Sequence, residues 1–334
     1  MEEQFLNIIE NFKNQKILVV GDLMLDQYLI GSVERISHEA PIPILDVKEI
    51  NQRPGGAANT AYNLQSLGGK VFLAGVVGAD ENGVLLKTLL DEKGIDTTGI
   101  AVDSQRKTTL KTRAVAKNQH IVRIDIEDKK PIRSEIEEKL LSFIGSQIKN
   151  LNAVIISDYA KGVVTPNLAR RLIALAKDNN VLSFVDPKGT EPSKYHGCNI
   201  IAPNKQELGA LLNIPVERLA QEGRFCQAGK MLLANMMSDN VVVKCSGEGL
   251  VVFEKNGNPF RYPAVNKMPV DVSGAGDTAI AVFALALSSG ADFKKAIILS
   301  SHACGVSVGK PGTTVVLPEE LKASLADYVN PNQN

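Results

Sequence analysis

Short, nearly continuous apolar runs alternate with amphipathic stretches along most of the chain. Such runs lack the two-residue alternation of half-exposed strands, so they predict strands that are buried on both faces. The stretch after Thr165-Pro166 predicts a helix, because threonine suits an N-cap and proline suits the first helical position. The predicted strands cover residues 17–20, 71–74, 154–156, 181–185, 200–201 and 241–243. The repeated strand–helix–strand order predicts an α/β fold, with a doubly wound, mostly parallel sheet and helices on both faces.

Two segments depart from this pattern. Residues 26–50 and about 107–126 alternate as strands do and show no helical period. The second has a turn candidate at Asn118-Gln119 and predicts a hairpin. We expect both segments to form a small β-sheet that serves as a lid over the main sheet. No linker divides the sequence, so we expect one domain over residues 1–334.

A polar or charged residue follows strand after strand. These residues are Asp22, Asp158, Asp186, Asn204 and Lys244. Each of them alone also suits an ordinary turn. Together they favour a binding site, because open α/β sheets bind ligands beyond the carboxyl ends of their strands.

The strongest local motif runs from Asp271 to Asp277 and precedes an apolar helical stretch. Its glycine-rich turn predicts an anion site at a helix N-terminus, formed by Gly274, Ala275 and Gly276. A carboxylate beside an anion site fits a general base, so Asp277 would accept a hydroxyl proton while the helix stabilises a phosphoryl group in transfer. The alternative is a capping aspartate. The chain lacks both the P-loop motif and the glycine pattern of dinucleotide folds.

Two weaker motifs accompany it. The pair Gly55-Gly56 opens another helical stretch with Asn59 in its first turn, which suits a polyhydroxylated ligand or is merely a tight turn. Asn204 and Glu207 are three residues apart after a strand. They either form an N-cap with a capping box or organise water and Mg²⁺ around ATP phosphates.

These three motifs, in this order, resemble those of the ribokinase-like, or PfkB, carbohydrate kinases along nearly the whole chain. The stretches ISDYAKG and DPKGT further resemble members that phosphorylate C1 of D-glycero-D-manno-heptose 7-phosphate for ADP-heptose and lipopolysaccharide core synthesis. The resemblance implies an ATP-dependent sugar kinase with a ribokinase-like fold. A ribokinase- or fructokinase-type specificity and a non-catalytic protein of this fold are the alternatives. Such members often carry a C-terminal nucleotidyltransferase domain, and we expect none here.

The resemblance also assigns roles to matching positions, with Asp277 as the base and Gly274, Ala275 and Gly276 as the anion hole. Sugar hydroxyls would be held by Asp26, Gly55, Gly56, Asn59 and Asp158. Asn204 and Glu207 would serve ATP and magnesium, and Lys244, Ser246, Gly247 and Gly249 would form part of the nucleotide wall. Asp271 and Ser273 match part of the family's monovalent cation site, which implies K⁺ there.

Three cationic residues near the expected site suggest that the sugar already carries a phosphate. Lys188 follows a strand end, and Arg113 and Arg123 lie on the lid. A hairpin with an even loop would place the two arginines on opposite faces, so we expect at most one of them to reach the phosphate. The same register would gather Val115, Val122 and Ile124 on one apolar face, which needs a cover. Relatives often pair through their lids, and we expect a homodimer.

Charge and composition narrow the partners and the compartment. Lysine plus arginine and aspartate plus glutamate number 37 each, so no basic surplus points to nucleic acid. The longest apolar run, residues 279–287, is far below the roughly 20 residues that span a bilayer, so we expect no membrane insertion. Four widely spaced cysteines predict reduced thiols in a cytoplasmic protein.

Overall fold

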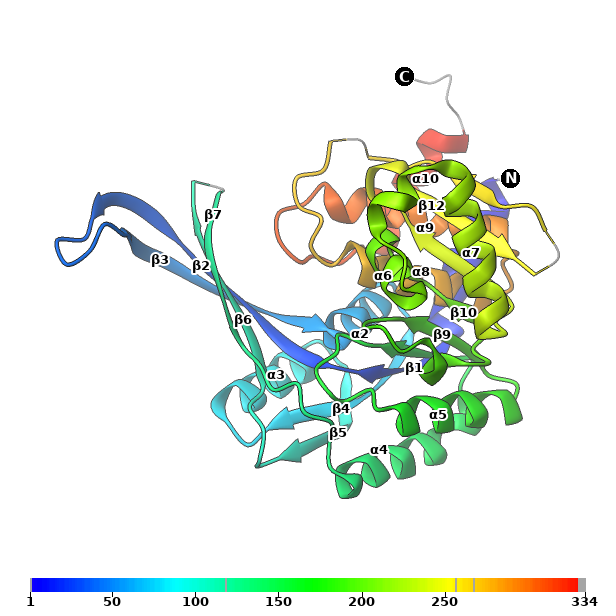
Figure 1. Cartoon of the computed structure of the whole chain (residues 1–334), viewed down its shortest axis with the longest axis horizontal. Coiled ribbons are helices and arrows are strands. Elements are labelled where there is room, and N and C mark those ends of the chain that lie inside the picture. The colour runs from blue at the N-terminus through cyan, green and yellow to red at the C-terminus, as the bar shows by residue number, and fades with distance from the viewer. Residues whose placement is uncertain (1, 118, 256, 267, 330–334) are drawn as a thin grey trace.

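The computed structural model describes residues 2–117, 119–255, 257–266 and 268–329. Its main sheet comprises β1 (Lys16–Gly21), β4 (Lys70–Gly78), β5 (Asp96–Asp103), β8 (Ala153–Ser157), β9 (Leu182–Asp186), β10 (Ile200–Ile201), β11 (Asn240–Lys244), β12 (Leu250–Glu254) and β13 (Phe260–Tyr262). The strand order is β13-β12-β11-β10-β9-β8-β1-β4-β5, with the β11–β12 and β12–β13 pairs antiparallel and the other pairs parallel (Figure 1). The predicted doubly wound, mostly parallel sheet is confirmed.

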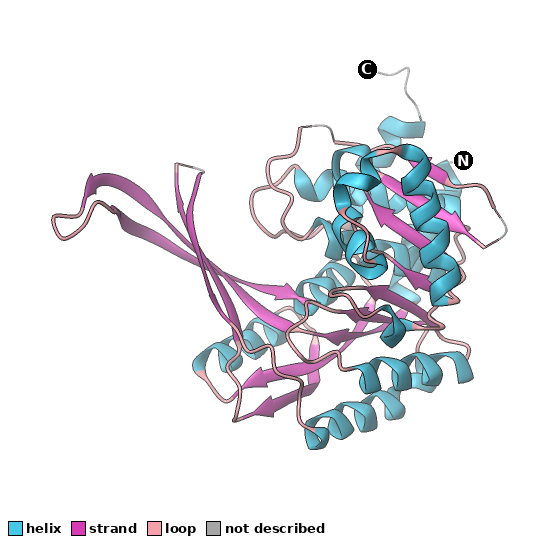
Figure 2. Ribbon diagram, viewed as in Figure 1, coloured by secondary structure: helices cyan, strands magenta, loops and turns pink. Residues whose placement is uncertain are grey.

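Helices cover both faces of this sheet (Figure 2). One face carries α1 (Glu2–Glu10), α2 (Ala57–Ser66), α3 (Glu81–Glu92), α8 (Ala275–Ser288), α9 (Phe293–Val308) and α10 (Pro318–Val329). The other carries α4 (Ser134–Gln147), α5 (Pro166–Asp178), α6 (Lys205–Leu212) and α7 (Glu222–Met236). In β1, Ile17 and Val19 enter the first core while Leu18 and Val20 enter the second, which explains the continuous apolar run. Within the described part of the chain, every helix is too short or too polar to cross a membrane.

A second, four-stranded sheet projects from the body (Figure 1). Its order is β3-β2-β6-β7, formed by β2 (Leu23–Ile36), β3 (Pro43–Gly56), β6 (Thr109–Ala116) and β7 (Gln119–Ile126). These strands account for most of the two segments expected to form the lid, and β2 and β3 extend beyond the predicted bounds. The predicted turn falls partly on Asn118, which lies outside the described residues. We call this second sheet the lid.

The register predicted for the β6–β7 hairpin is wrong. Ala116 pairs with Gln119 and Val115 with His120, but beyond a register shift Ala114 pairs with Val122, Arg113 with Arg123 and Thr112 with Ile124. The shift adds one residue to β7, and a one-residue offset moves all later side chains to the other face. Arg113 and Arg123 therefore lie opposite each other on the same face. Val122 and Ile124 lie on the opposite face from Val115.

Candidate active site

The glycine-rich motif begins α8 as predicted. Gly274 precedes the helix with φ of 79°, a conformation that residues with side chains rarely adopt. A Cβ at this position would also lie 2.8 Å from Asn59 Nδ2. The N–H groups of a first helical turn have no acceptor within the helix, although that of Ala275 is directed at the Val272 carbonyl at 3.3 Å. The start of α8 therefore combines anion-binding N–H groups with the carboxylate of Asp277.

Three side chains donate hydrogen bonds to Asp277, which is buried. Tyr159 Oη and Thr60 Oγ1 donate to Oδ1 at 2.7 and 3.1 Å, and Asn59 Nδ2 donates to Oδ2 at 2.7 Å. Burial raises the pKa of Asp277 to about 6, against the opposing effect of these hydrogen bonds. A carboxylate with a pKa close to neutral is well matched to accept a proton from a hydroxyl group.

The second glycine motif begins α2 and places the donors. Gly56 ends β3 with φ of 57°, and a Cβ there would lie 2.6 Å from the carbonyl oxygen of Asp22. Asn59 and Thr60 then occupy the first turn of α2 and point at the start of α8. The expected helix start with Asn59 in its first turn is thus confirmed. Gly56 thus forms a tight turn, and that turn also places the polar side chain of Asn59 at the site.

The face of the lid that carries Asp26 is turned toward this site. Asp26 Oδ1 accepts a hydrogen bond from Arg113 Nη1 at 2.6 Å, and both side chains are largely buried. A Cβ at Gly55 would lie 2.6 Å from Asp26 Oδ2, so the glycine permits this close approach. On the same face, Arg53 Nη1 donates to the carbonyl of Thr313 at 2.8 Å. The root of the lid is therefore joined to the loop that follows α9.

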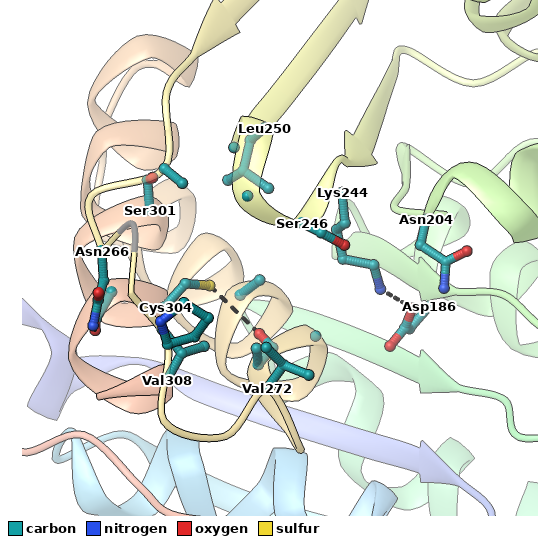
Figure 3. A pocket seen from close by; sticks show the side chains of 18 of the residues that line it. Asp186, Asn204, Lys244, Ser246, Leu250, Asn266, Val272, Ser301, Cys304 and Val308 are labelled. Atoms are coloured by element: carbon teal, nitrogen blue, oxygen red, sulfur yellow. Dashed lines mark hydrogen bonds and ion pairs between the residues drawn. The ribbon is translucent and has the colours of Figure 1, made fainter. Parts of the chain in front are cut away.

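A cavity of about 430 Å³ opens beside the start of α8. Figure 3 shows a polar end with Asp186, Asn204 and Lys244, and an apolar end with Val272 and Val308. All six residues assigned to ATP line it, namely Asn204, Glu207, Lys244, Ser246, Gly247 and Gly249. Asp158, Lys188, Ala275 and Gly276 line it as well. The cavity thus has an apolar part for a flat base and a polar part that ends at the anion-binding turn.

The polar end is organised by two ion pairs. Lys244 Nζ lies 2.5 Å from Asp186 Oδ1, and this carboxylate raises the pKa of Lys244 although burial opposes the charged form. Asn204 accepts from the Glu207 N–H at 2.9 Å and Glu207 Oε2 accepts from the Asn204 N–H at 2.8 Å, so the capping box is real. Glu207 Oε1 also accepts from Lys188 Nζ at 2.9 Å. Glu207 therefore caps the N-terminus of α6 and also lines the cavity.

Asp271 folds the turn that leads into α8. Its Oδ1 accepts from the Ser273 N–H at 2.8 Å and its Oδ2 from the Gly312 N–H at 3.0 Å. Burial opposes ionisation, but these hydrogen bonds lower the pKa of Asp271 below its ordinary value. In the part of the chain that the structure describes, no group of three or more His, Cys, Asp or Glu side chains could hold a metal ion.

Comparison with known protein families shows to which family of proteins the chain belongs. A model of the pfkB family carbohydrate kinases matches residues 14–320. The chain belongs to the PfkB family of carbohydrate kinases. Its sequence is 44% identical over 308 residues to the "Bifunctional protein HldE" of Geobacter metallireducens, covering 92% of this chain and 62% of that protein. The Helicobacter pylori (strain J99) protein of the same name is 42% identical over 307 residues, covering 92% and 65%. The kinase thus spans less than two thirds of these relatives' length.

Solved structures confirm the fold. A ribokinase from Thermotoga maritima superposes with a TM-score of 0.71 at 24% identity, covering 93% of the kinase and 99% of that chain. The phosphofructokinase-2 of Escherichia coli in complex with potassium gives a TM-score of 0.76 at 18% identity, covering 93% and 98%. The ribokinase-like architecture predicted from the motifs is therefore confirmed.

Two of the strand-end aspartates of this kinase serve the fold of the site. Asp22 is fully buried and accepts backbone N–H bonds from Tyr159, Lys161 and Val163 at 2.7, 3.1 and 3.0 Å. Asp158 Oδ2 accepts from Lys194 Nζ and Tyr195 Oη at 2.5 and 2.6 Å, so its carboxylate is already engaged. Its predicted contact with the sugar stays a prediction.

Sequence reasoning missed several residues that shape the site. Thr60, Tyr159, Lys194 and Tyr195 belonged to no motif with an assigned role. The available signal for Tyr159 was its place directly after a strand-end aspartate in ISDYAKG. Its target Asp277 is 118 positions away, a separation that no local pattern reports.

Proposed function

We propose that the kinase transfers the γ-phosphoryl group of ATP to the C1 hydroxyl of D-glycero-D-manno-heptose 7-phosphate, giving the 1,7-bisphosphate of ADP-heptose and lipopolysaccharide core synthesis. The observation that carries the proposal is the buried Asp277 at the anion-binding start of α8, beside a cavity of nucleotide size. The relatives named HldE, at 42% and 44% identity, support the choice of sugar.

The residues fit ATP and magnesium. Lys244 and the N–H groups at the start of α8 would face the phosphates, and the apolar end of the cavity would receive the base. Magnesium would neutralise phosphate charge, with Asn204 and Glu207 orienting its water ligands. K⁺ near Asp271 and Ser273 would stabilise the turn before α8, since Asp271 is held ionised there.

The sugar would lie between the lid and α2. Asp26 and Asn59 would bind its hydroxyls, and Gly55 and Gly56 would let it approach the backbone. Asp277 would remove the proton of the attacking hydroxyl while α8 stabilises the transferring group. The closed lid would exclude water from the phosphoryl acceptor position, which limits hydrolysis of ATP.

A panel of sugars tests the assignment. Purified protein with ATP and Mg²⁺ is assayed on heptose 7-phosphate, ribose, fructose and fructose 6-phosphate, and the product is located by phosphorus NMR. We expect the highest kcat/KM with heptose 7-phosphate and phosphorylation at C1. Higher kcat/KM with another sugar would replace the proposed acceptor, and no turnover with any sugar would favour a non-catalytic role.

The lid arginines are the proposed anchor for the 7-phosphate. Arg113 and Arg123 are opposite each other on the face of Asp26, and the side chain of Arg123 is 57% exposed. Lys188, also assigned to this phosphate from the sequence, lies instead beside Glu207 on the cavity wall, which supports contact with ATP phosphates. One charge-assisted contact contributes roughly 1.5–3 kcal/mol, or about ten- to a hundredfold in affinity.

Substrate pairs separate these roles. Arg123→Ala should lower kcat/KM for heptose 7-phosphate at least tenfold while leaving unphosphorylated heptose nearly unchanged, and Lys188→Ala should raise the KM for ATP. Arg171→Ala removes an exposed arginine of α5 and is the matched control. Equal kcat/KM of the wild-type kinase for heptose and heptose 7-phosphate would exclude the phosphate anchor and leave the kinase assignment intact.

We also propose a homodimer that pairs through the outer face of the lid. The face opposite Asp26 and Arg113 carries large apolar side chains that are 40% to 58% exposed, namely Val47, Ile50, Val122, Ile124 and Ile126. An exposed apolar surface of this kind marks an interaction site. Sedimentation at micromolar concentration should show a dimer, and Val122→Asp/Ile124→Asp should dissociate it while Val84→Asp on α3 does not. A wild-type monomer would contradict the proposal.

The compartment proposed for this reaction is the cytoplasm, where ATP is available. All four cysteines, Cys198, Cys226, Cys245 and Cys304, are unpaired, and thiols persist in reducing compartments. Fractionation of the producing cells would test this, and activity recovered only from an extracytoplasmic fraction would contradict it.

A further inference from the structure

The loop after β8 carries a hydroxyl group that reaches the predicted base. Tyr159 Oη donates to Asp277 Oδ1 at 2.7 Å, and Thr60 Oγ1 donates to the same oxygen at 3.1 Å. A carboxylate oxygen offers about two lone-pair sites, so both sites of Oδ1 are filled. Within the described part of the chain, Oδ2 accepts from Asn59 Nδ2 alone. One lone pair of Oδ2 therefore remains for a substrate.

We propose that Tyr159 is a positioning residue which, together with Thr60, fills Oδ1 so that Oδ2 is the atom that accepts the proton of the sugar hydroxyl. The inference rests on the proposed function, with Asp277 as general base. In the step, the sugar O–H bond breaks as its oxygen bonds to the γ-phosphorus, and the proton passes to Oδ2. The bond from that phosphorus to the bridging oxygen breaks, and its electron pair leaves with ADP.

The backbone around Tyr159 is fixed from two sides. At the end of β1, Asp22 Oδ2 accepts hydrogen bonds from the N–H groups of Tyr159 and Lys161, and Ala160 between them has a φ of 54°. Directly after β7, Glu127 pairs with Lys161 Nζ at 2.5 Å, and this contact lowers the pKa of Glu127 to about 2. Such anchoring holds the tyrosine hydroxyl in place before the substrate arrives, which is the requirement for preorganisation.

The hydroxyl remains a donor throughout the working pH range. Burial and the carboxylate of Asp277 raise the pKa of Tyr159 well above its ordinary value. The charged groups around the pair are Asp186 and Lys244 at the cavity and Asp26 on the lid. Burial and Asp186 raise the pKa of Asp277, and the bond from Tyr159 lowers it. Loss of that bond must therefore raise the pKa of Asp277 above about 6.

Tyr159→Phe tests the inference through the pH profile of kcat/KM for heptose 7-phosphate, or for the better sugar that the panel identifies. We expect the midpoint of the acid limb to rise by roughly one pH unit. The loss of kcat/KM should then grow from about twofold at pH 7 to about tenfold at pH 5 and disappear near pH 8. A merely structural defect would give the same loss at every pH. The KM for ATP should not change.

Tyr195→Phe is the matched control, because its hydroxyl is also buried but donates to Asp158 instead. It should leave the midpoint of the acid limb in place. An unshifted midpoint in Tyr159→Phe, or a higher kcat that reveals a blocking hydroxyl, would overturn the inference. If Tyr159→Phe does not fold, Thr60→Val removes the other Oδ1 donor and must shift the limb in the same direction. Near-full activity of Asp277→Asn would instead show that the base itself is misassigned.

Discussion

The helices α2 and α8 begin in a similar way but present different side chains in their first turns. Each follows a glycine with positive φ, Gly56 at 57° and Gly274 at 79°. The first turn of α2 has no acidic residue and presents Asn59 and Thr60, whereas that of α8 presents Asp277. One helix start supplies donors and the other supplies the acceptor, so their contact keeps a buried carboxylate hydrogen-bonded.

The difference also concerns charge. The side chains that α2 presents to the site, Asn59 and Thr60, carry no charge, so their own contribution does not titrate. Asp277 carries a pKa raised to about 6 by burial, so both catalysis and stability should depend on pH through α8. Substitutions of the α2 donors should therefore change the pH dependence only by shifting the pKa of Asp277, whereas removal of Asp277 should abolish it.

The largest expected effect comes from removing the acceptor. Asp277→Asn keeps the shape of the side chain and removes the proton acceptor, so kcat should fall about 10²- to 10⁴-fold. ATP affinity, measured by calorimetry, should change little, because the substitution leaves the cavity and its lysines, Lys188 and Lys244, in place. A variant that keeps more than roughly a tenth of the wild-type kcat would reject Asp277 as the base.

The next largest effect should be a loss of stability on substitution of Gly56, the glycine before α2. Gly56→Ala forces an unfavourable φ and brings a Cβ within 2.6 Å of the Asp22 carbonyl, so unfolding free energy should fall by about 3 kcal/mol. Gly290, after α8, has φ of 88° and no atom within 4 Å of an added Cβ. Gly290→Ala should therefore cost only about 1 kcal/mol. Equal urea midpoints for both variants would contradict the steric argument.

A smaller effect should appear in the pH dependence of stability. The folded-state pKa of Asp277 is about 6, above its ordinary 3.8, so folding favours the protonated form. Its favourable contribution is complete below pH 4 and is lost as the pH rises through 6. Asp277→Asn should thus be more stable than wild type by about 2 kcal/mol at pH 7.5, after allowing for loss of the hydrogen bond from Asn59 Nδ2. The gain should vanish near pH 4, as followed by urea unfolding.

The sequence predicted the elements of this site better than its contacts. Buried strands and glycine-led helix starts are local patterns, and β1, β8, α2 and α8 appear where the pattern placed them. The face of the lid strand β7 was not predictable, because a bulge leaves no signal in an alternation of this length. The register error separated Arg113 from Arg123, which the structure places on one face.

Long-range partners explain the remaining misses. Asp22 and Asp158 follow strands as ligand-binding residues do, yet each is engaged by groups of the chain itself. Whether a strand-end carboxylate faces a ligand or a neighbouring loop depends on residues that are far away in sequence. The capping box of Asn204 and Glu207 was one of the two alternatives that the sequence offered, because both partners lie within one helical turn.

The smallest expected effect is at Thr60, where two substitutions distinguish the contribution of the hydroxyl group from that of the methyl group. Its Oγ1 lies 3.1 Å from Asp277 Oδ1, farther than the 2.7 Å of Tyr159 Oη, so its bond is the weaker of the two. Thr60→Ser keeps the donor and should hold kcat/KM within about twofold, whereas Thr60→Val should lose about two- to fivefold at pH 6. The loss should shrink toward pH 8, because removing one of the two donors to Oδ1 raises the pKa of Asp277, which matters only where that group titrates. If Thr60→Ser were as impaired as Thr60→Val, the methyl group and its packing would be the feature that α2 contributes, and the donor–acceptor contrast between the two helix starts would fail at this residue.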